Sequence, residues 1–187
     1  MNLQRVSIIA FRVPLIVTLI ILTFTSISVN AAGLNSYQSP DGKYAFLYPT
    51  GWVKTTVIGG PQVIFHDIIN SDETISLLIS DVTPESKLEA LGDPTRVGEI
   101  LQKKVIAPEG SGRKANLVEA RQRDVNGYNF YDLEYEINLK DRKRHELATV
   151  IVNRGKLYTF AASTNEGRWR KVKSLFEDVV TSFTFLV

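Results

Sequence analysis

Residues 126–163 decide the fold class, and they read NGYNFYDLEYEINLKDRKRHELATVIVNRGKLYTFAAS. Three runs within this stretch are rich in β-branched and aromatic side chains, which is typical of strands; they cover residues 128–139, 146–153 and 156–163. Asn126-Gly127 and Arg154-Gly155 lie where tight turns would join neighbouring strands, because glycine accepts a positive φ. The stretch therefore predicts consecutive antiparallel strands connected by short turns.

Working outward, further strands and two helical segments are expected. The other runs with strand character cover residues 43–49, 62–69, 74–80 and 114–123. Residues 84–104 have helical spacing, but Gly92-Asp93-Pro94 breaks them into two pieces, with Thr95 as the expected cap of the second. In residues 169–183, large apolar side chains recur every three or four positions and line one side of a helix. These elements predict an α+β fold, in which a mainly antiparallel sheet carries helices on both faces as an α/β/α sandwich.

The first 31 residues have the pattern of an export signal. Arg5 and Arg12 precede an uncharged, mostly apolar run from Val13 to Val29, and small residues follow at Ala31 and Ala32. We predict a signal peptide over residues 1–31, cleaved after Ala31 or one residue later, and a single domain over residues 32–187. An uncleaved anchor is the alternative, which the short run and its hydroxyl residues disfavour for a bilayer core of about 30 Å.

Charge argues against a nucleic-acid partner. The whole chain has 22 basic and 20 acidic residues, and the signal segment contains Arg5 and Arg12 but no acid, so 22 − 2 leaves 20 basic residues against 20 acidic ones. A formally neutral domain lacks the positive charge on which nucleic-acid binding depends. Acids dominate residues 32–101 and bases dominate residues 138–173, which predicts a dipole if the fold keeps the two segments apart.

The residue inventory excludes most enzyme mechanisms. The chain has no cysteine and only two histidines, so thiol catalysis, cysteine-bound zinc and a three-histidine zinc site are ruled out. The sequence also lacks a nucleophile elbow, a phosphate-binding loop and a dinucleotide fingerprint. We therefore expect no enzymatic activity. A hydrolase in which Glu134 and Glu136 pair in a cleft is the one catalytic alternative left open.

His66 and His145 are the candidate metal ligands. Each is followed by an acid in or beside a predicted strand, where neighbouring side chains point to opposite faces and cannot easily share an ion. A carboxylate from an adjacent strand could complete a weak zinc or manganese site. The alternative is that both histidines are structural and hydrogen-bonded.

Two clusters of basic residues are the candidate docking surface. Lys140, Arg142, Lys143 and Arg144 lie in a loop between two strands, and Arg168, Arg170 and Lys171 open the last helix. Cations at a helix N-terminus oppose the helix dipole, so helix stability does not favour them there. Their placement predicts binding to a negatively charged partner surface.

In the order of the chain, several motifs resemble the PsbP family. They include Tyr37, Gly42, Phe46-Leu47-Tyr48-Pro49, Gly51-Trp52, residues 63–69 (VIFHDII), Leu91-Gly92-Asp93-Pro94, residues 154–158 (RGKLY), Arg168-Trp169 and Ser182-Phe183-Thr184. The resemblance spans residues 34–187 almost completely, which makes it more specific than any single motif. The short signal and the Phe-His-Asp-Ile-Ile segment resemble the cyanobacterial branch of the family.

The resemblance implies an extrinsic protein of photosystem II in the thylakoid lumen. It implies docking to lumenal subunits of the complex, with a role in assembly, stability or protection of the oxygen-evolving side, and a family link to calcium and chloride retention at the manganese cluster. It also points to His145 and His66 as zinc or manganese positions, so a metal-binding or metal-delivery domain is the alternative function. Since the chain lacks the lipid-bearing cysteine of many cyanobacterial members, we expect it to be peripheral to the membrane through protein contacts. We also expect a monomer that requires no cofactor.

Overall fold

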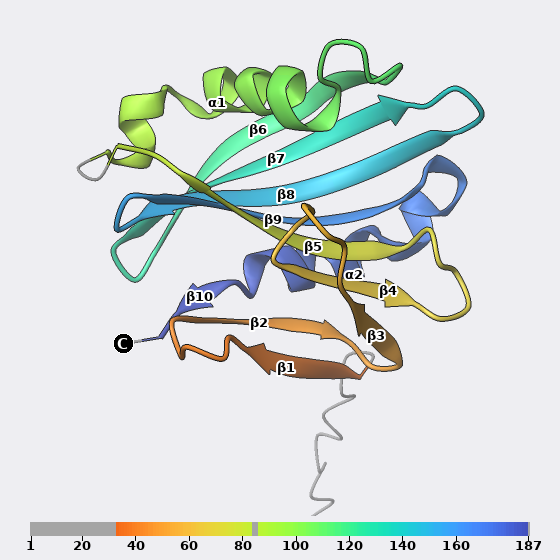
Figure 1. Cartoon of the computed structure of the whole chain (residues 1–187), viewed down its shortest axis with the longest axis horizontal. Coiled ribbons are helices and arrows are strands. Elements are labelled where there is room, and N and C mark those ends of the chain that lie inside the picture. The colour runs from red at the N-terminus through yellow and green to blue at the C-terminus, as the bar shows by residue number, and fades with distance from the viewer. Residues whose placement is uncertain (1–32, 84–85, 187) are drawn as a thin grey trace, which may run out of the picture. The chain divides into compact units, whose positions relative to one another are not determined.

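A seven-stranded antiparallel sheet forms the centre of the domain (Figure 1). The computed structural model describes residues 33–83 and 86–186, so the predicted signal peptide lies outside the described residues. The strand order is β3-β4-β5-β9-β8-β7-β6. The bounds of these strands are Trp52–Thr55 (β3), Val63–Asp67 (β4), Thr74–Asp81 (β5), Lys114–Val125 (β6), Tyr128–Asn138 (β7), Lys143–Asn153 (β8) and Lys156–Asn165 (β9).

Both predicted tight turns are present, and they fix the register of the long strands. Asn126 and Gly127 have φ values of 51° and 79°, and Arg154 and Gly155 have φ values of 48° and 72°. Positive φ at both central residues is the mark of a two-residue hairpin turn whose twist matches that of the flanking strands. The turns therefore place β6 beside β7 and β8 beside β9, as the sequence predicts.

A second sheet contains three short strands that the sequence analysis only partly predicted. Its order is β1-β2-β10, with bounds Leu34–Gln38, Tyr44–Pro49 and Thr184–Phe185. β2 was expected, whereas β1, β10 and β3 of the large sheet were missed. These strands have two to five residues, which is too short for their alternation to be recognised without the partner strand.

The helical segments lie where the sequence predicts them, but their ends and one cap differ. A 3₁₀ turn at Leu88–Leu91 precedes α1 (Pro94–Leu101), and a π-helical turn continues it over Gln102–Ile106. The prediction of Thr95 as cap is wrong, because the Asp93 carboxylate accepts a hydrogen bond from the Arg96 backbone N–H at 2.8 Å. Pro94 then occupies the first helical position, where its missing N–H costs nothing.

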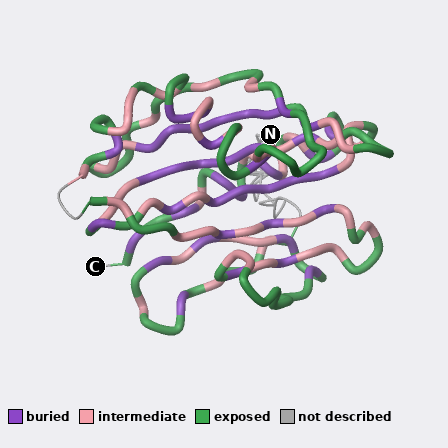
Figure 2. The backbone as a smooth tube through the Cα atoms, turned by 45° about the horizontal axis from the view of Figure 1, so that its top comes forward, coloured by how far each residue is buried: buried purple, intermediate pink, exposed green. Residues whose placement is uncertain are grey.

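The prediction of helices on both faces of the sheet is confirmed. A 3₁₀ turn at Glu166–Arg168 leads into α2 (Trp169–Thr181), which packs on β8, β9 and β2, while α1 packs on β6 and β7 from the other face. Figure 2 shows the buried residues concentrated along the strands between these layers. Among residues 33–83 and 86–186, none of the helices is long and apolar enough to cross a membrane.

Each face of the sheet has its own apolar core. On the α2 face, Phe46 of the small sheet, Phe160 of β9 and Phe176 of α2 are almost completely buried. On the α1 face, Leu133 and Tyr135 of β7 lie beneath the helix. The Tyr135 hydroxyl donates to the Gly98 carbonyl at 3.0 Å. A Cβ at Gly98 would lie 2.8 Å from Leu117 Cδ2, so a glycine is needed for this close approach.

Candidate functional site

The two predicted basic clusters lie at the same end of the sheet. Arg144 at the start of β8 is paired with Asn165 at the end of β9, which brings the β7–β8 turn next to the start of α2. Asp72 in the β4–β5 turn holds the first cluster against the end of β9. Its backbone carbonyl accepts from Arg144 Nη2 at 2.8 Å, and its carboxylate accepts from Asn165 Nδ2 at 2.9 Å and lies 3.4 Å from Arg142 Nη2.

Glu73, the neighbour of Asp72, holds the second cluster. Its buried carboxylate forms an ion pair with Arg168 and accepts a hydrogen bond from the Thr164 hydroxyl. The acidic and basic segments of the sequence therefore meet at this end instead of lying on separate faces, which reduces the dipole expected from their separation. Sequence reasoning missed both acids as partners, because their arginines are more than 70 residues away.

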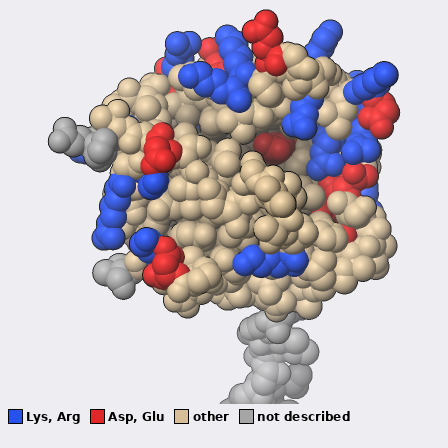
Figure 3. Space-filling view, in the orientation of Figure 1, with Lys and Arg blue, Asp and Glu red and all other residues tan. Residues whose placement is uncertain are grey.

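The remaining basic residues are exposed. Among residues 33–83 and 86–186, Lys140, Lys143, Arg170 and Lys171 take part in no ion pair, and all four side chains face solvent. We call these four residues the basic end. Figure 3 shows basic groups along the top and the right-hand side of the domain, with acidic groups among them, and the β7–β8 turn lies on the right in Figure 1. Of the predicted docking residues, these four are free to contact a partner, whereas Arg142, Arg144 and Arg168 form ion pairs with acids of the same domain.

His145 lies under the first turn of α2, between two carboxylates. Its Nε2 is 2.8 Å from Glu134 Oε1 on β7, and its Nδ1 is 2.8 Å from Glu166 Oε2 on the 3₁₀ turn. The Trp169 ring stacks on the imidazole with a centroid distance of 4.1 Å and an interplanar angle of 11°. Both ring nitrogens are therefore occupied, and Trp169 covers one ring face.

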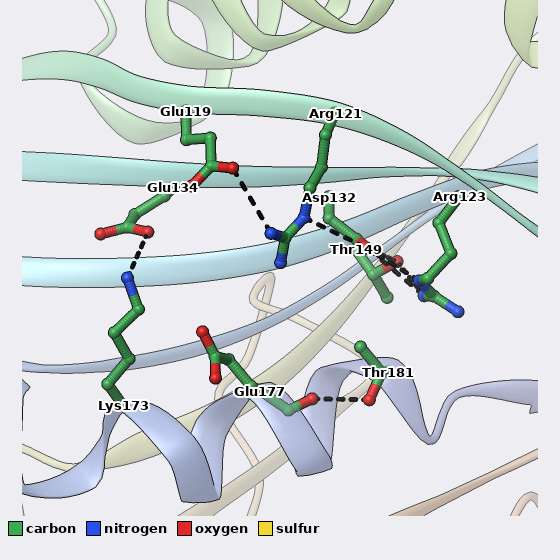
Figure 4. Close-up of polar contacts among 9 residues, drawn as sticks. All are labelled: Glu119, Arg121, Arg123, Asp132, Glu134, Thr149, Lys173, Glu177 and Thr181. Carbon is green, nitrogen blue, oxygen red and sulfur yellow. Dashed lines mark hydrogen bonds and ion pairs between the residues drawn. The ribbon is translucent and has the colours of Figure 1, made fainter.

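Glu134 is the most constrained acid of this cluster. Lys173 Nζ of α2 donates to its second oxygen at 3.1 Å, a contact drawn in Figure 4. Burial by itself would raise the pKa of Glu134, but the bonds from His145 and Lys173 outweigh it and hold the pKa below the ordinary value of 4.5. Glu134 is thus bound by two donors from other elements, while Glu136 is exposed. This arrangement gives no support to a catalytic carboxylate pair.

The two histidines lie in different surroundings. His66 is on β4, and its Nδ1 is 3.1 Å from the carbonyl oxygen of Asp67. Within the described ranges, no group of three histidine or acidic side chains converges on a point where a metal could bind. A metal at His145 would have to replace the contact to Glu166, because the side of Glu134 is closed by Lys173. The metal assignments of His66 and His145 stay predictions.

A second buried acid on the same face was missed by the sequence analysis. Asp132 is 3% exposed, and it accepts from Arg123 Nε at 2.8 Å, from Arg123 Nη2 at 3.2 Å and from the Thr149 hydroxyl at 2.8 Å (Figure 4). Arg121 lies 3.9 Å away and also contacts Glu119. The alternating charges at positions 119, 121 and 123 of β6 were the available signal, since side chains two apart share a face. The network satisfies a buried charge, so we assign it a structural role.

The fold and these contacts define an α+β domain of the antiparallel-sandwich class with one exposed basic end. The family model described as PsbP matches residues 32–185. CyanoP of Synechocystis sp. is 42% identical over 176 residues, which cover 91% of this chain and 94% of that protein. CyanoP of Thermosynechococcus vestitus is 39% identical over 158 residues, which cover 82% of this chain and 86% of that protein. The chain belongs to the PsbP family.

The structural comparison agrees with the sequence comparison. The solution structure of Synechocystis CyanoP matches with a TM-score of 0.71 and 42% identity, and the match covers 84% of this chain and 95% of that one. The predicted resemblance to the cyanobacterial branch and the predicted fold class are both confirmed.

Proposed function

We propose that this protein is an extrinsic, lumenal protein of photosystem II that docks to the complex through its basic end, without catalysing a reaction. Membership of the PsbP family supports the association with photosystem II, and the export pattern of residues 1–31 supports the thylakoid lumen. The docking role includes assembly, stability or protection of the oxygen-evolving side. The partner surface is acidic and belongs to lumenal subunits of the complex.

The single observation that carries this proposal is the construction of the basic end. Asp72 and Glu73 tie the β7–β8 turn and the start of α2 together, so that two segments distant in sequence present their free cations on one rigid surface. Rigidity lowers the entropy lost on docking. Exposed cations at a fixed spacing also steer a charged partner and add specificity.

The test is a binding series on isolated photosynthetic membranes. We expect Arg170→Glu/Lys171→Glu to lose most binding at low salt, and we expect wild-type binding to fall as the screening length shortens from about 30 Å at 0.01 M to about 10 Å at 0.1 M salt. Lys87→Glu/Arg154→Glu is the matched control, because it reverses two exposed cations at the opposite end of the sheet. Equal binding of both double variants would show that the basic end is not the interface.

A weak metal site at His145 is the second candidate function. It is favoured by the 2.8 Å contact between His145 Nδ1 and Glu166 Oε2. The Glu166 side chain is 41% exposed, which gives a metal ion access to this side of the imidazole. Histidine and carboxylate suit zinc or manganese, yet only two protein ligands are available, so affinity should be low. Equilibrium dialysis with each ion tests this. Binding that is unchanged in His145→Ala, with His66→Ala as the comparison, would remove the site.

A further inference from the structure

The α1 face of the sheet has an elongated groove that the docking function does not use. α1 packs on β6 and β7, so it leaves the same face of β5 and β9 open. The side chains there are small: Ser76 is paired with Ala161, and Thr74 is paired with Ser163. Two hollows of about 360 Å³ and 450 Å³ result, and they are contiguous because Leu78, Val105 and Thr159 line both.

The two ends of the groove differ in chemistry. The first hollow is lined by Arg113, Arg142 and Arg144 together with Glu146. The second hollow is mostly apolar, with Val97 and Leu101 of α1 facing Leu157 of β9. Its charged lining residues are Asp81, which is paired with Lys156, and Lys104. Figure 3 shows the hollow on this face with an acidic group recessed inside it.

The charge balance of the first hollow favours an anion. Arg142 is paired with both Asp72 and Asp141, and Arg144 is paired with Asp72 and also donates to the Ser163 hydroxyl at 2.9 Å. Arg113 contacts only the Ile106 carbonyl, at 3.5 Å, within the described part of the chain. Among the side chains that line the hollow, the one carboxylate is that of Glu146, and Arg113 is the arginine that has no ion pair with any described residue. A guanidinium group binds oxyanions through paired N–H donors.

We propose that this groove binds an anionic amphiphile with a single alkyl chain, its oxyanion head at Arg113 and its chain along Leu78, Val105 and Leu157. The continuity of a basic hollow with an apolar one is the observation that selects this class. A small anion would leave the apolar hollow unused, and an apolar molecule would leave the arginines without a partner. The head can be a carboxylate or a phosphate, which share the chemistry that the arginines recognise.

The experiment is calorimetric titration of the whole protein at pH 7 with decane-1-sulfonate below its micelle concentration. Dodecanoate and decyl phosphate distinguish a carboxylate head from a phosphate head. Inorganic phosphate tests the head group without an alkyl chain, and decyltrimethylammonium tests the same alkyl chain with a cationic head. We expect saturable binding of the anionic chains at one site, with phosphate and the cationic chain at least tenfold weaker. Equal affinity for inorganic phosphate or for the cationic chain would overturn the proposal, and so would no binding of any anionic chain.

Variants at the groove locate the site. Arg113→Gln should weaken binding of decane-1-sulfonate about tenfold, and Val105→Trp should abolish it by filling the place where the two hollows meet. Val105 is 40% exposed, so the larger side chain does not have to enter the core. The controls are Arg121→Gln, an exposed arginine on the opposite face, and Val118→Trp, at a valine that is 51% exposed on β6. Binding that survives both groove variants at wild-type strength would refute the site.

Glu146→Gln is an independent test, because it predicts the direction in which the affinity should change. Removing the one acid that lines the first hollow should strengthen binding of the anionic chains several-fold, because it removes a repulsive charge. A decrease would mean that the head is a cation held by this carboxylate, which is the opposite of the proposal. Since glutamine has nearly the same shape as glutamate, the readout does not depend on a change in packing.

Discussion

Glu146 makes the stability of this protein depend on pH in a direction opposite to that of most carboxylates. It is on β8, next to His145 in sequence, but it points to the α1 face, where it makes no hydrogen bond with any of the described residues. Burial raises the pKa of Glu146 to about 7 from the ordinary 4.5, although Arg144 and Arg113 pull it down. The folded state therefore disfavours the ionised form.

The sign and size of this pH dependence of stability follow from the coupling between proton binding at Glu146 and folding. Because the folded pKa lies above the unfolded one, the unfolded chain releases its proton first, and stability falls as the pH rises from 4.5 to about 7, with no further change above that. Each pKa unit corresponds to about 1.4 kcal/mol, which gives at most roughly 3 kcal/mol. Water reaches the carboxyl through the open hollow, so we expect about 2 kcal/mol.

Glu146→Gln tests this directly. The variant should gain about 2 kcal/mol in free energy of unfolding relative to wild type between pH 5 and pH 8, as measured by urea denaturation followed by circular dichroism. Groups that titrate elsewhere contribute equally to both proteins and cancel. Glu136→Gln, the same change at an exposed side chain of β7, should show no such gain. A difference between Glu146→Gln and wild type that is constant from pH 5 to pH 8 would refute the burial argument.

Three further stability predictions can be checked by the same denaturation at pH 7. Asp93→Ala should cost about 1 kcal/mol, because it removes the carboxylate that caps α1; Asp93→Asn should restore most of it. Gly98→Val should cost roughly 1–3 kcal/mol through overlap with Leu117, whereas a cost below 0.5 kcal/mol would show that α1 shifts freely. Asp132→Ala should cost about 3 kcal/mol by leaving the half-buried Arg123 without its carboxylate partner, and Arg123→Met/Asp132→Leu should recover part of that loss.

The sequence predicted the parts of the fold that depend on local chemistry. The turn at Asn126-Gly127 needs positive φ at both residues, and the Asn-Gly dipeptide by itself indicates such a turn. The strand β10 could not be found in this way, since its two residues become a strand only by pairing with Ala45 and Tyr44 of β2. Predictions therefore succeeded where neighbours along the chain determine the structure, and failed where a distant strand does.

The candidate site shows the same division. The prediction that His145 and Glu146 point to opposite faces followed from strand alternation alone, and the structure has His145 in the α2 core and Glu146 in the groove. Trp169 was recognised as an apolar helix residue, but its stacking on His145 depends on how α2 crosses the sheet. Asp72 was seen as part of a hairpin turn, and nothing local indicates that it binds Arg144.

The way the two helices cover the sheet explains why some of its polar side chains have hydrogen-bond partners and others do not. α2 lies across β8 and β9, so the acids and the histidine on that face had to find internal partners, and Glu134 has both His145 and Lys173. α1 packs mainly on β6 and β7, so Glu146 on β8 faces an open groove and has no hydrogen-bond partner among the described residues. A partly buried carboxyl without a hydrogen-bond partner costs free energy unless a ligand or water compensates it. The uncovered half of the α1 face is therefore where a bound small molecule should be sought, apart from the basic end at which a protein partner would dock.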